Sequence, residues 1–143
     1  MTYNELEELL TENNFKKETI DNLLNQNVSV LLKRASKKKY NKIIEILIKN
    51  KISKDTIVKS LSILGKAKIE DIEKTLVILN NYNISVKSIE KCMSVLTEGK
   101  PEEKEKVLKI LYKNNINQET IEDCLLILAK GKADEIEKTL KTL

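Results

Sequence analysis

Two consecutive stretches decide how this chain folds. They are IEDIEKTLVILNNYNISVKSIEKCMSVLTEGK over residues 69–100 and PEEKEKVLKILYKNNINQETIEDCLLILAKGK over residues 101–132. Apolar residues, lysines and an isoleucine-containing turn recur in both at the same places. A third copy occupies residues 37–68, so the copies follow one another every 32 residues without a spacer. A fixed period of this size is typical of helical-repeat proteins and predicts an all-α fold.

Each copy predicts a hairpin of two helices. In the first helix the apolar residues recur at helical spacing, as Ile72, Leu76 and Leu79 do. The turn that follows has a good N-cap residue for the second helix, preceded by an isoleucine that suits a hydrophobic staple. The N-cap candidates are Ser53, Ser85 and Asn117. The second helix is then expected to end near Gly99 in one copy and Gly131 in the next.

The rest of the chain extends this pattern in both directions. Residues 1–36 are a divergent copy with a longer or bent second helix, and residues 133–143 repeat only the first helix. There Thr142 replaces an isoleucine that would contact a following copy, which suggests a cap, and a piece of a longer array is the alternative. We therefore expect one helical-repeat domain over residues 1–143, in which tandem helical hairpins stack as a short α-solenoid.

Composition agrees with this interpretation. Hydrophobic residues make up 41% of the 143, enough for a core, and only three glycines and one proline are present, which argues against a turn-rich β fold. Cys92 and Cys124 occupy the same place in successive copies and are expected to be reduced and buried. The sequence has no long apolar run and no signal peptide, so we expect no membrane span and a cytoplasmic location.

The sequence gives little support for catalysis. It has no histidine, no glycine-rich phosphate loop, and no serine or cysteine beside an obvious base. Acidic pairs such as Glu70 and Asp71 lie in the first turns of helices, where they complement the helix dipole. We therefore expect a non-enzymatic binding module without a metal or cofactor.

A basic segment between residues 33 and 42, KRASKKKYNK, is the main functional candidate. Its six cations are Lys33, Arg34, Lys37, Lys38, Lys39 and Lys42. They account for the whole positive excess of a chain with 26 basic and 22 acidic residues. Cations at the start of a helix oppose its dipole, which indicates a role other than helix stability. Such a patch suits nucleic acid, an acidic protein surface or anionic lipid, and a merely solvated turn is the alternative.

Further lysines recur with the period. One set, between the copies, consists of Lys68, Lys100 and Lys132, and stacking would align it in a row. A second set, Lys74, Lys106 and Lys138, stands four residues after an acid, as in ordinary helix-stabilising pairs. Because only one of the 26 basic residues is an arginine and tryptophan is absent, phosphate contacts are favoured over base reading.

Two functions follow from these patterns. The first is electrostatic nucleic-acid binding through the six cations of the basic segment and the lysines between the copies. The alternative is a protein–protein interaction scaffold that binds a peptide or a partner subunit through an exposed apolar patch. The residues expected in that patch are Tyr82, Tyr112 and Leu126.

The repeats also resemble a known family. A first helix that ends in leucine, an Asn-Ile-Ser or Asn-Ile-Asn turn, and a second helix such as Glu119-Thr120-Ile121 with Leu125 and Leu128 are similar to the helical repeats of mitochondrial transcription termination factors and their bacterial look-alikes. The resemblance covers most of the chain. It implies a curved solenoid that holds nucleic acid in a basic groove.

Overall fold

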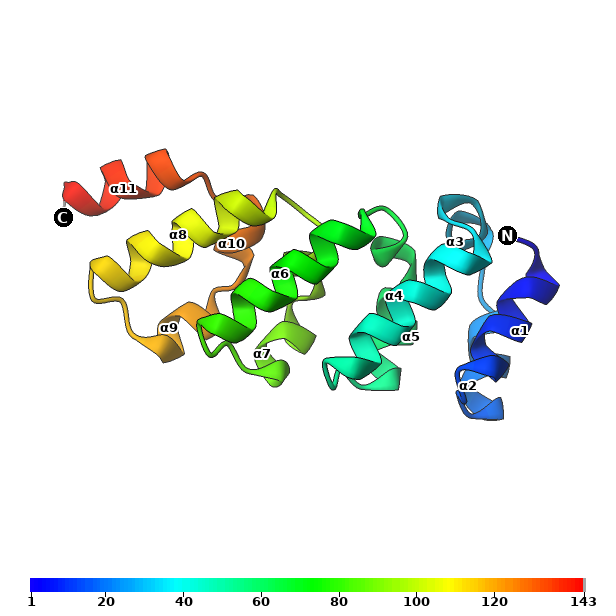
Figure 1. Ribbon diagram of the computed structural model, residues 1–143. Coiled ribbons are helices and arrows are strands. Elements are labelled where there is room, and N and C mark those ends of the chain that lie inside the picture. Colours follow the sequence, from blue (N-terminus) through cyan, green and yellow to red (C-terminus); the bar gives the residue numbers. More distant parts are fainter. Residues whose placement is uncertain (143) are drawn as a thin grey trace. The chain divides into compact units, whose positions relative to one another are not determined.

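A computed structural model describes residues 1–142, which are all-helical (Figure 1). This range contains eleven α-helices and one short 3-10 helix, and no strand. The predicted all-α class is therefore confirmed, whereas the stacking of the copies as a solenoid stays a prediction. The chain divides into two compact units, Met1–Ile69 and Glu70–Leu143. This boundary falls at the start of the 69–100 copy.

The first unit is a cluster of five helices. They are α1 (Tyr3–Glu12), α2 (Lys17–Leu24), α3 (Ser29–Arg34), α4 (Lys37–Lys49) and α5 (Lys54–Leu64). Helix α1 packs against α2 and α4, and α5 packs against α4 and α3. The longer or bent helix expected in the divergent copy is two helices, α2 and α3, separated by residues 25–28. The core of this unit contains Leu6, Leu10, Ile43, Leu47 and Leu61, all fully buried.

In the second unit the second helix of each copy is divided into two short helices. Its elements are α6 (Ile69–Asn81), α7 (Val86–Lys91), η1 (Met93–Leu96), α8 (Pro101–Lys113), α9 (Gln118–Asp123), α10 (Leu126–Lys130) and α11 (Ala133–Lys141). Helix α8 packs against α10 and α11, and η1 packs against α7 and α10. The expected closing helix is α11, and Leu143 lies outside the described residues.

The predicted caps explain why the second helix of each hairpin begins where it does. Ser53, Ser85 and Asn117 each accept a hydrogen bond from the backbone N–H three residues later. The isoleucines before the two serines, Ile52 and Ile84, are buried as a hydrophobic staple requires. The N-cap predictions are therefore confirmed.

The turns before these caps share a left-handed residue. It is Lys51, Asn83 or Asn115, with φ between 58° and 66°, and Asn14 has φ 62° at the matching place in the divergent copy. Asparagine adopts this conformation more readily than most residues, so the turn is well matched to its sequence in three of the four copies.

The second helices of the later copies differ from the sequence expectation. Helix α5 is continuous, but the 69–100 and 101–132 copies leave the helical conformation at Cys92 (φ −140°, ψ 64°) and Cys124 (φ −122°, ψ 37°). The prediction of one unbroken second helix was therefore wrong for both of these copies. Because of this break Cys124 is exposed and Cys92 half-buried, whereas Ser60 at the matching position of α5 is buried. Both thiols are free, but the predicted burial is wrong for Cys124.

None of the helices over residues 1–142 has the length and apolar character that crossing a membrane requires.

Candidate functional site

The basic segment runs from the end of α3 into the first turns of α4, in the first unit. Ser36 separates the two helices and accepts a hydrogen bond from the Lys39 N–H as the N-cap of α4. The six cations divide into two groups here. Three of them bind groups of the protein itself, and three extend into solvent.

Arg34 and Lys39 hold the end of a neighbouring helix. The Arg34 guanidinium donates to the Ser62 carbonyl at 2.7 Å and to its hydroxyl at 3.1 Å, and the Lys39 ammonium donates to the Gly65 carbonyl at 2.9 Å. These carbonyls lie at the C-terminal end of α5, where helix carbonyls lack partners and the helix dipole favours cations. The two side chains therefore have a structural role.

Lys37 joins α4 to α1. Its ammonium lies 3.1 Å from a Glu8 oxygen and 3.0 Å from a Glu12 oxygen. The hydrogen bonds to Glu12 and Glu8 raise the Lys37 pKa. The basic segment has no acid of its own, but α1, far earlier in the sequence, supplies Glu8 and Glu12. Lys37 is the first residue of α4 and so opposes the helix dipole most directly. The two carboxylates offset its positive charge.

The remaining cations form an exposed lysine set, defined as Lys33, Lys38 and Lys42. Lys38 and Lys42 are one turn apart on the same face of α4. The next turn of that face carries Glu45, which accepts a hydrogen bond from the Asn41 amide at 3.0 Å. Along this face of α4, the stretch without an acidic residue therefore ends at Lys42.

Two of the lysines between the copies meet in the second unit. Lys100 and Lys132 line one hollow of about 640 Å³ with Lys130 and Lys138. Carboxylates share this hollow, namely Glu103, Asp134 and Glu135. Glu103 accepts a hydrogen bond from the Ala133 N–H at 2.7 Å and so occupies the N-terminus of α11. The hollow is therefore mixed in charge. The third lysine, Lys68, is exposed in the first unit.

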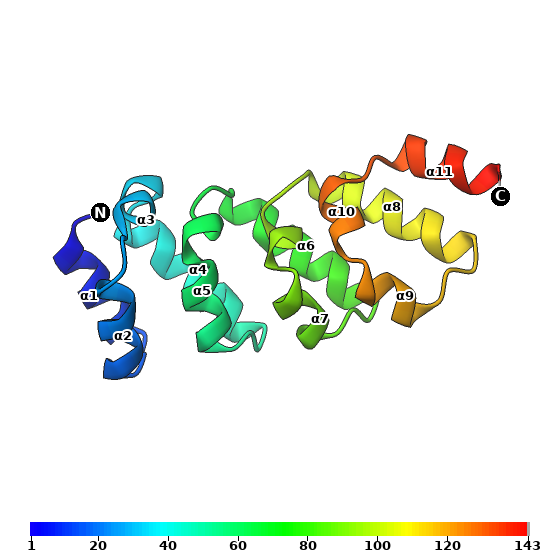
Figure 2. The same ribbon diagram turned by 180° about the vertical axis from the view of Figure 1, so that it is seen from behind.

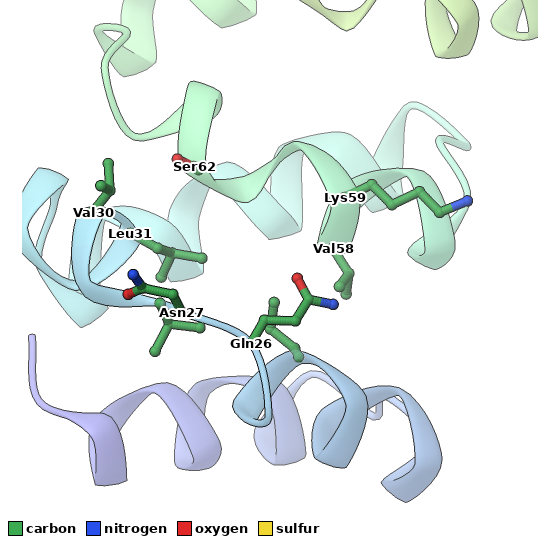
Figure 3. A pocket seen from close by; sticks show the side chains of 9 residues that line it. Gln26, Asn27, Val30, Leu31, Val58, Lys59 and Ser62 are labelled. Atoms are coloured by element: carbon green, nitrogen blue, oxygen red, sulfur yellow. The ribbon is translucent and has the colours of Figure 1, made fainter.

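A hollow of about 170 Å³ in the first unit lies between α5 and the residues that join α2 to α3. Figure 3 shows Gln26 and Val58 on opposite sides of it, while the ammonium of Lys59 points away. Lys59 is the one titratable side chain that lines it. In residues 1–142 no group of three or more histidine, cysteine or carboxylate side chains could hold a metal. We find no acid and base paired for proton transfer in this hollow.

Lys104 is a buried cation that sequence reasoning missed. Its side chain is 1% exposed, and its ammonium lies 3.4 Å from the Thr75 hydroxyl, a long hydrogen bond. Burial lowers its pKa to about 8, against the opposing charges of Asp71 and Glu98. The repeat offers a signal that could have found it, because the matching positions hold Tyr40, Ile72 and Ile136.

The apolar patch predicted for protein binding is only partly present. Tyr82 and Tyr112 are half-buried and stacked with ring centroids 5.4 Å apart, and the Tyr112 hydroxyl donates to the Tyr82 carbonyl at 3.1 Å. The two rings therefore tie the end of α6 to α8. Leu126 is 49% exposed, as expected for that patch.

The chain matches no protein-family model, and no curated protein or solved structure matches it either. The resemblance to mitochondrial transcription termination factors therefore stays a prediction. The functional argument consequently rests on the residues and contacts described above.

Proposed function

We propose that the first unit binds nucleic acid electrostatically, as a non-enzymatic module that contacts phosphates and reads no bases. One observation carries the proposal. Of the six cations in the basic segment, three have structural partners, and Lys33, Lys38 and Lys42 remain exposed with no acid in the sequence between them. Structural roles explain half of the segment and leave the exposed lysine set for a ligand.

Phosphate contacts suit these residues better than base contacts do. A lysine ammonium on a flexible stem binds a phosphate as a point charge, whereas base reading relies on arginine forks and aromatic stacking. The only arginine, Arg34, donates to Ser62, and the chain has no tryptophan. Lys100 and Lys132 would supplement binding from the second unit, weakened by the carboxylates beside them.

The salt dependence of binding gives a quantitative expectation. Each phosphate contact on duplex DNA contributes a slope of about −0.9 to the plot of log affinity against log salt. Three contacts therefore predict a loss of about 40-fold between about 50 and 200 mM salt. Fluorescence anisotropy of labelled single-stranded and double-stranded DNA and RNA would measure it.

Charge reversal tests whether the exposed lysine set is the site. The variant K33E/K38E/K42E should lose binding at low salt. The control K16E/K17E/K59E reverses three other exposed lysines of the same unit, with the same change in net charge. It should keep most of the affinity. Equal loss in both variants, or no binding of the unaltered protein at low salt, would show that the set is not a phosphate site.

A further inference from the structure

An apolar groove of about 350 Å³ lies between α6 and α8 in the second unit. The two helices run side by side in both views (Figures 1 and 2). The apolar part of its lining consists of Val77, Ile78 and Pro101. Val77 is 58% exposed, the most exposed of the large apolar side chains described. The volume of the groove falls within the range of roughly 300–1,000 Å³ that is typical of ligand pockets.

The fold does not require an apolar surface at this place. In the earlier copies Glu8 and Glu45 hold the Val77 position, and Lys37 holds the Pro101 position. In the first unit the corresponding place between α1 and α4 contains the Lys37–Glu8 ion pair, with a distance of 3.1 Å between the charged atoms. The second unit leaves the corresponding position open and apolar. The repeat therefore does not impose an exposed apolar residue at the position of Val77.

The charged residues that line the groove are mostly acidic. Lys74 lies 3.8 Å from Glu102, so these two charges offset each other across the helix pair, and Lys74 does not form the expected ion pair with Glu70. Glu73 and Glu105 also line the groove and add two negative charges. A groove lined by apolar side chains and by carboxylates favours an apolar side chain flanked by cations, and it repels phosphates.

We propose that this groove binds a peptide segment of a partner protein, in which one or two apolar side chains are flanked by lysine or arginine. The apolar side chain covers Val77 and Pro101, and the cations face Glu73 and Glu105. A surface this small supports weak, transient binding. The groove and the exposed lysine set lie in different units, so this proposal is independent of nucleic-acid binding.

A selection from random peptides of about twelve residues, displayed on phage and captured on the full chain, tests the proposal without assuming a partner. The enriched peptides should share an apolar centre with basic flanks. One of them, synthesised with a fluorophore, is then titrated against variants. Val77→Ser should weaken binding about tenfold through lost apolar contact. E73Q/E105Q should weaken it at low salt and reduce its salt dependence.

Leu126→Ser is the matched control, because Leu126 is similarly exposed in the same unit but does not line the groove. It should leave peptide affinity unchanged, and Val77→Ser should leave nucleic-acid binding unchanged. The proposal is overturned if no peptide is enriched, if the enriched peptides lack cations, or if Val77→Ser binds them normally. A dimer that Val77→Ser converts to monomer would overturn it too, because a second copy would then cover the groove.

Discussion

Helices α4 and α8 open corresponding copies of the repeat in the two units and have the same length, thirteen residues. At their first position α4 has Lys37, held by two carboxylates, and α8 has Pro101 beside an apolar groove. Three residues later α4 buries Tyr40 and α8 buries Lys104. At these two positions α4 has a charged residue outside and a neutral one inside, and α8 has the reverse. The repeat therefore requires a large side chain at the inner position and leaves its polarity open.

The two inner residues differ in how well the protein satisfies them. The Tyr40 hydroxyl donates to the Leu31 carbonyl at 2.7 Å, and the absence of a side chain on Gly65 leaves room for the ring. The Lys104 ammonium has three donors and one hydroxyl acceptor at 3.4 Å. Burying a charge with so little compensation is unfavourable, which is why its pKa falls to about 8. The second unit is therefore less stable at neutral pH than its apolar core alone would make it.

Lys104→Ile should have the largest effect, because it gives α8 the residue that Ile72 provides in α6. Because burial lowers the folded-state pKa of Lys104 from the ordinary 10.5 to about 8, we expect a stabilisation of about 3 kcal/mol at pH 7. Urea denaturation followed by circular dichroism would measure the free energy of unfolding. Lys106→Gln, which removes an exposed charge from the same helix, should change it little.

The pH dependence of this effect has a definite sign. Below about pH 8 the Lys104 ammonium is protonated in both states and its full cost is present. Between about pH 8 and 10.5 the unfolded chain binds more protons than the folded one, so stability rises with pH. The advantage of Lys104→Ile should therefore shrink toward pH 10. An advantage that is constant with pH, or a loss of stability at pH 7, would contradict the account of Lys104.

Tyr40→Phe tests the other inner residue and should have a smaller effect of the opposite sign. It removes the buried hydrogen bond to the Leu31 carbonyl, which we expect to cost about 1–2 kcal/mol. Tyr3→Phe is a matched control, since the Tyr3 hydroxyl makes an exposed hydrogen bond to the Leu24 carbonyl at 3.2 Å. Thermal denaturation should separate the two variants. Equal melting temperatures would show that the buried Tyr40 hydroxyl contributes no more to stability than the exposed Tyr3 hydroxyl.

Sequence reasoning succeeded where the determinants are local. Helical periodicity and the caps Ser53, Ser85 and Asn117 depend on residues within one turn of each other, and the structure confirms them. The breaks at Cys92 and Cys124 were missed because the copies differ little in local pattern from α5, which is continuous.

The candidate site was harder to predict because its charges are balanced across the fold. Lys37 has no acid near it in sequence, yet α1 supplies Glu8 and Glu12. Arg34 and Lys39 bind the Ser62 and Gly65 carbonyls at the end of α5, which are also distant from them in the sequence. The sequence therefore predicted where the cations concentrate but not which of them are available. Comparison of matching positions, as with Lys104 and Val77, would have identified the unusual residues.

The smallest predicted effect concerns the turn between α4 and α5. Lys51 has φ 66°, whereas the matching residues of the second unit are Asn83 and Asn115. Lysine adopts this conformation less readily than asparagine, and the Lys51 side chain is exposed, so its removal costs no packing. Lys51→Asn should therefore stabilise the protein by about 0.5 kcal/mol, and Asn83→Lys should destabilise it similarly. Melting temperatures that shift in opposite directions would show that asparagine is preferred to lysine at this left-handed position in both units. A shift in the same direction would contradict this preference.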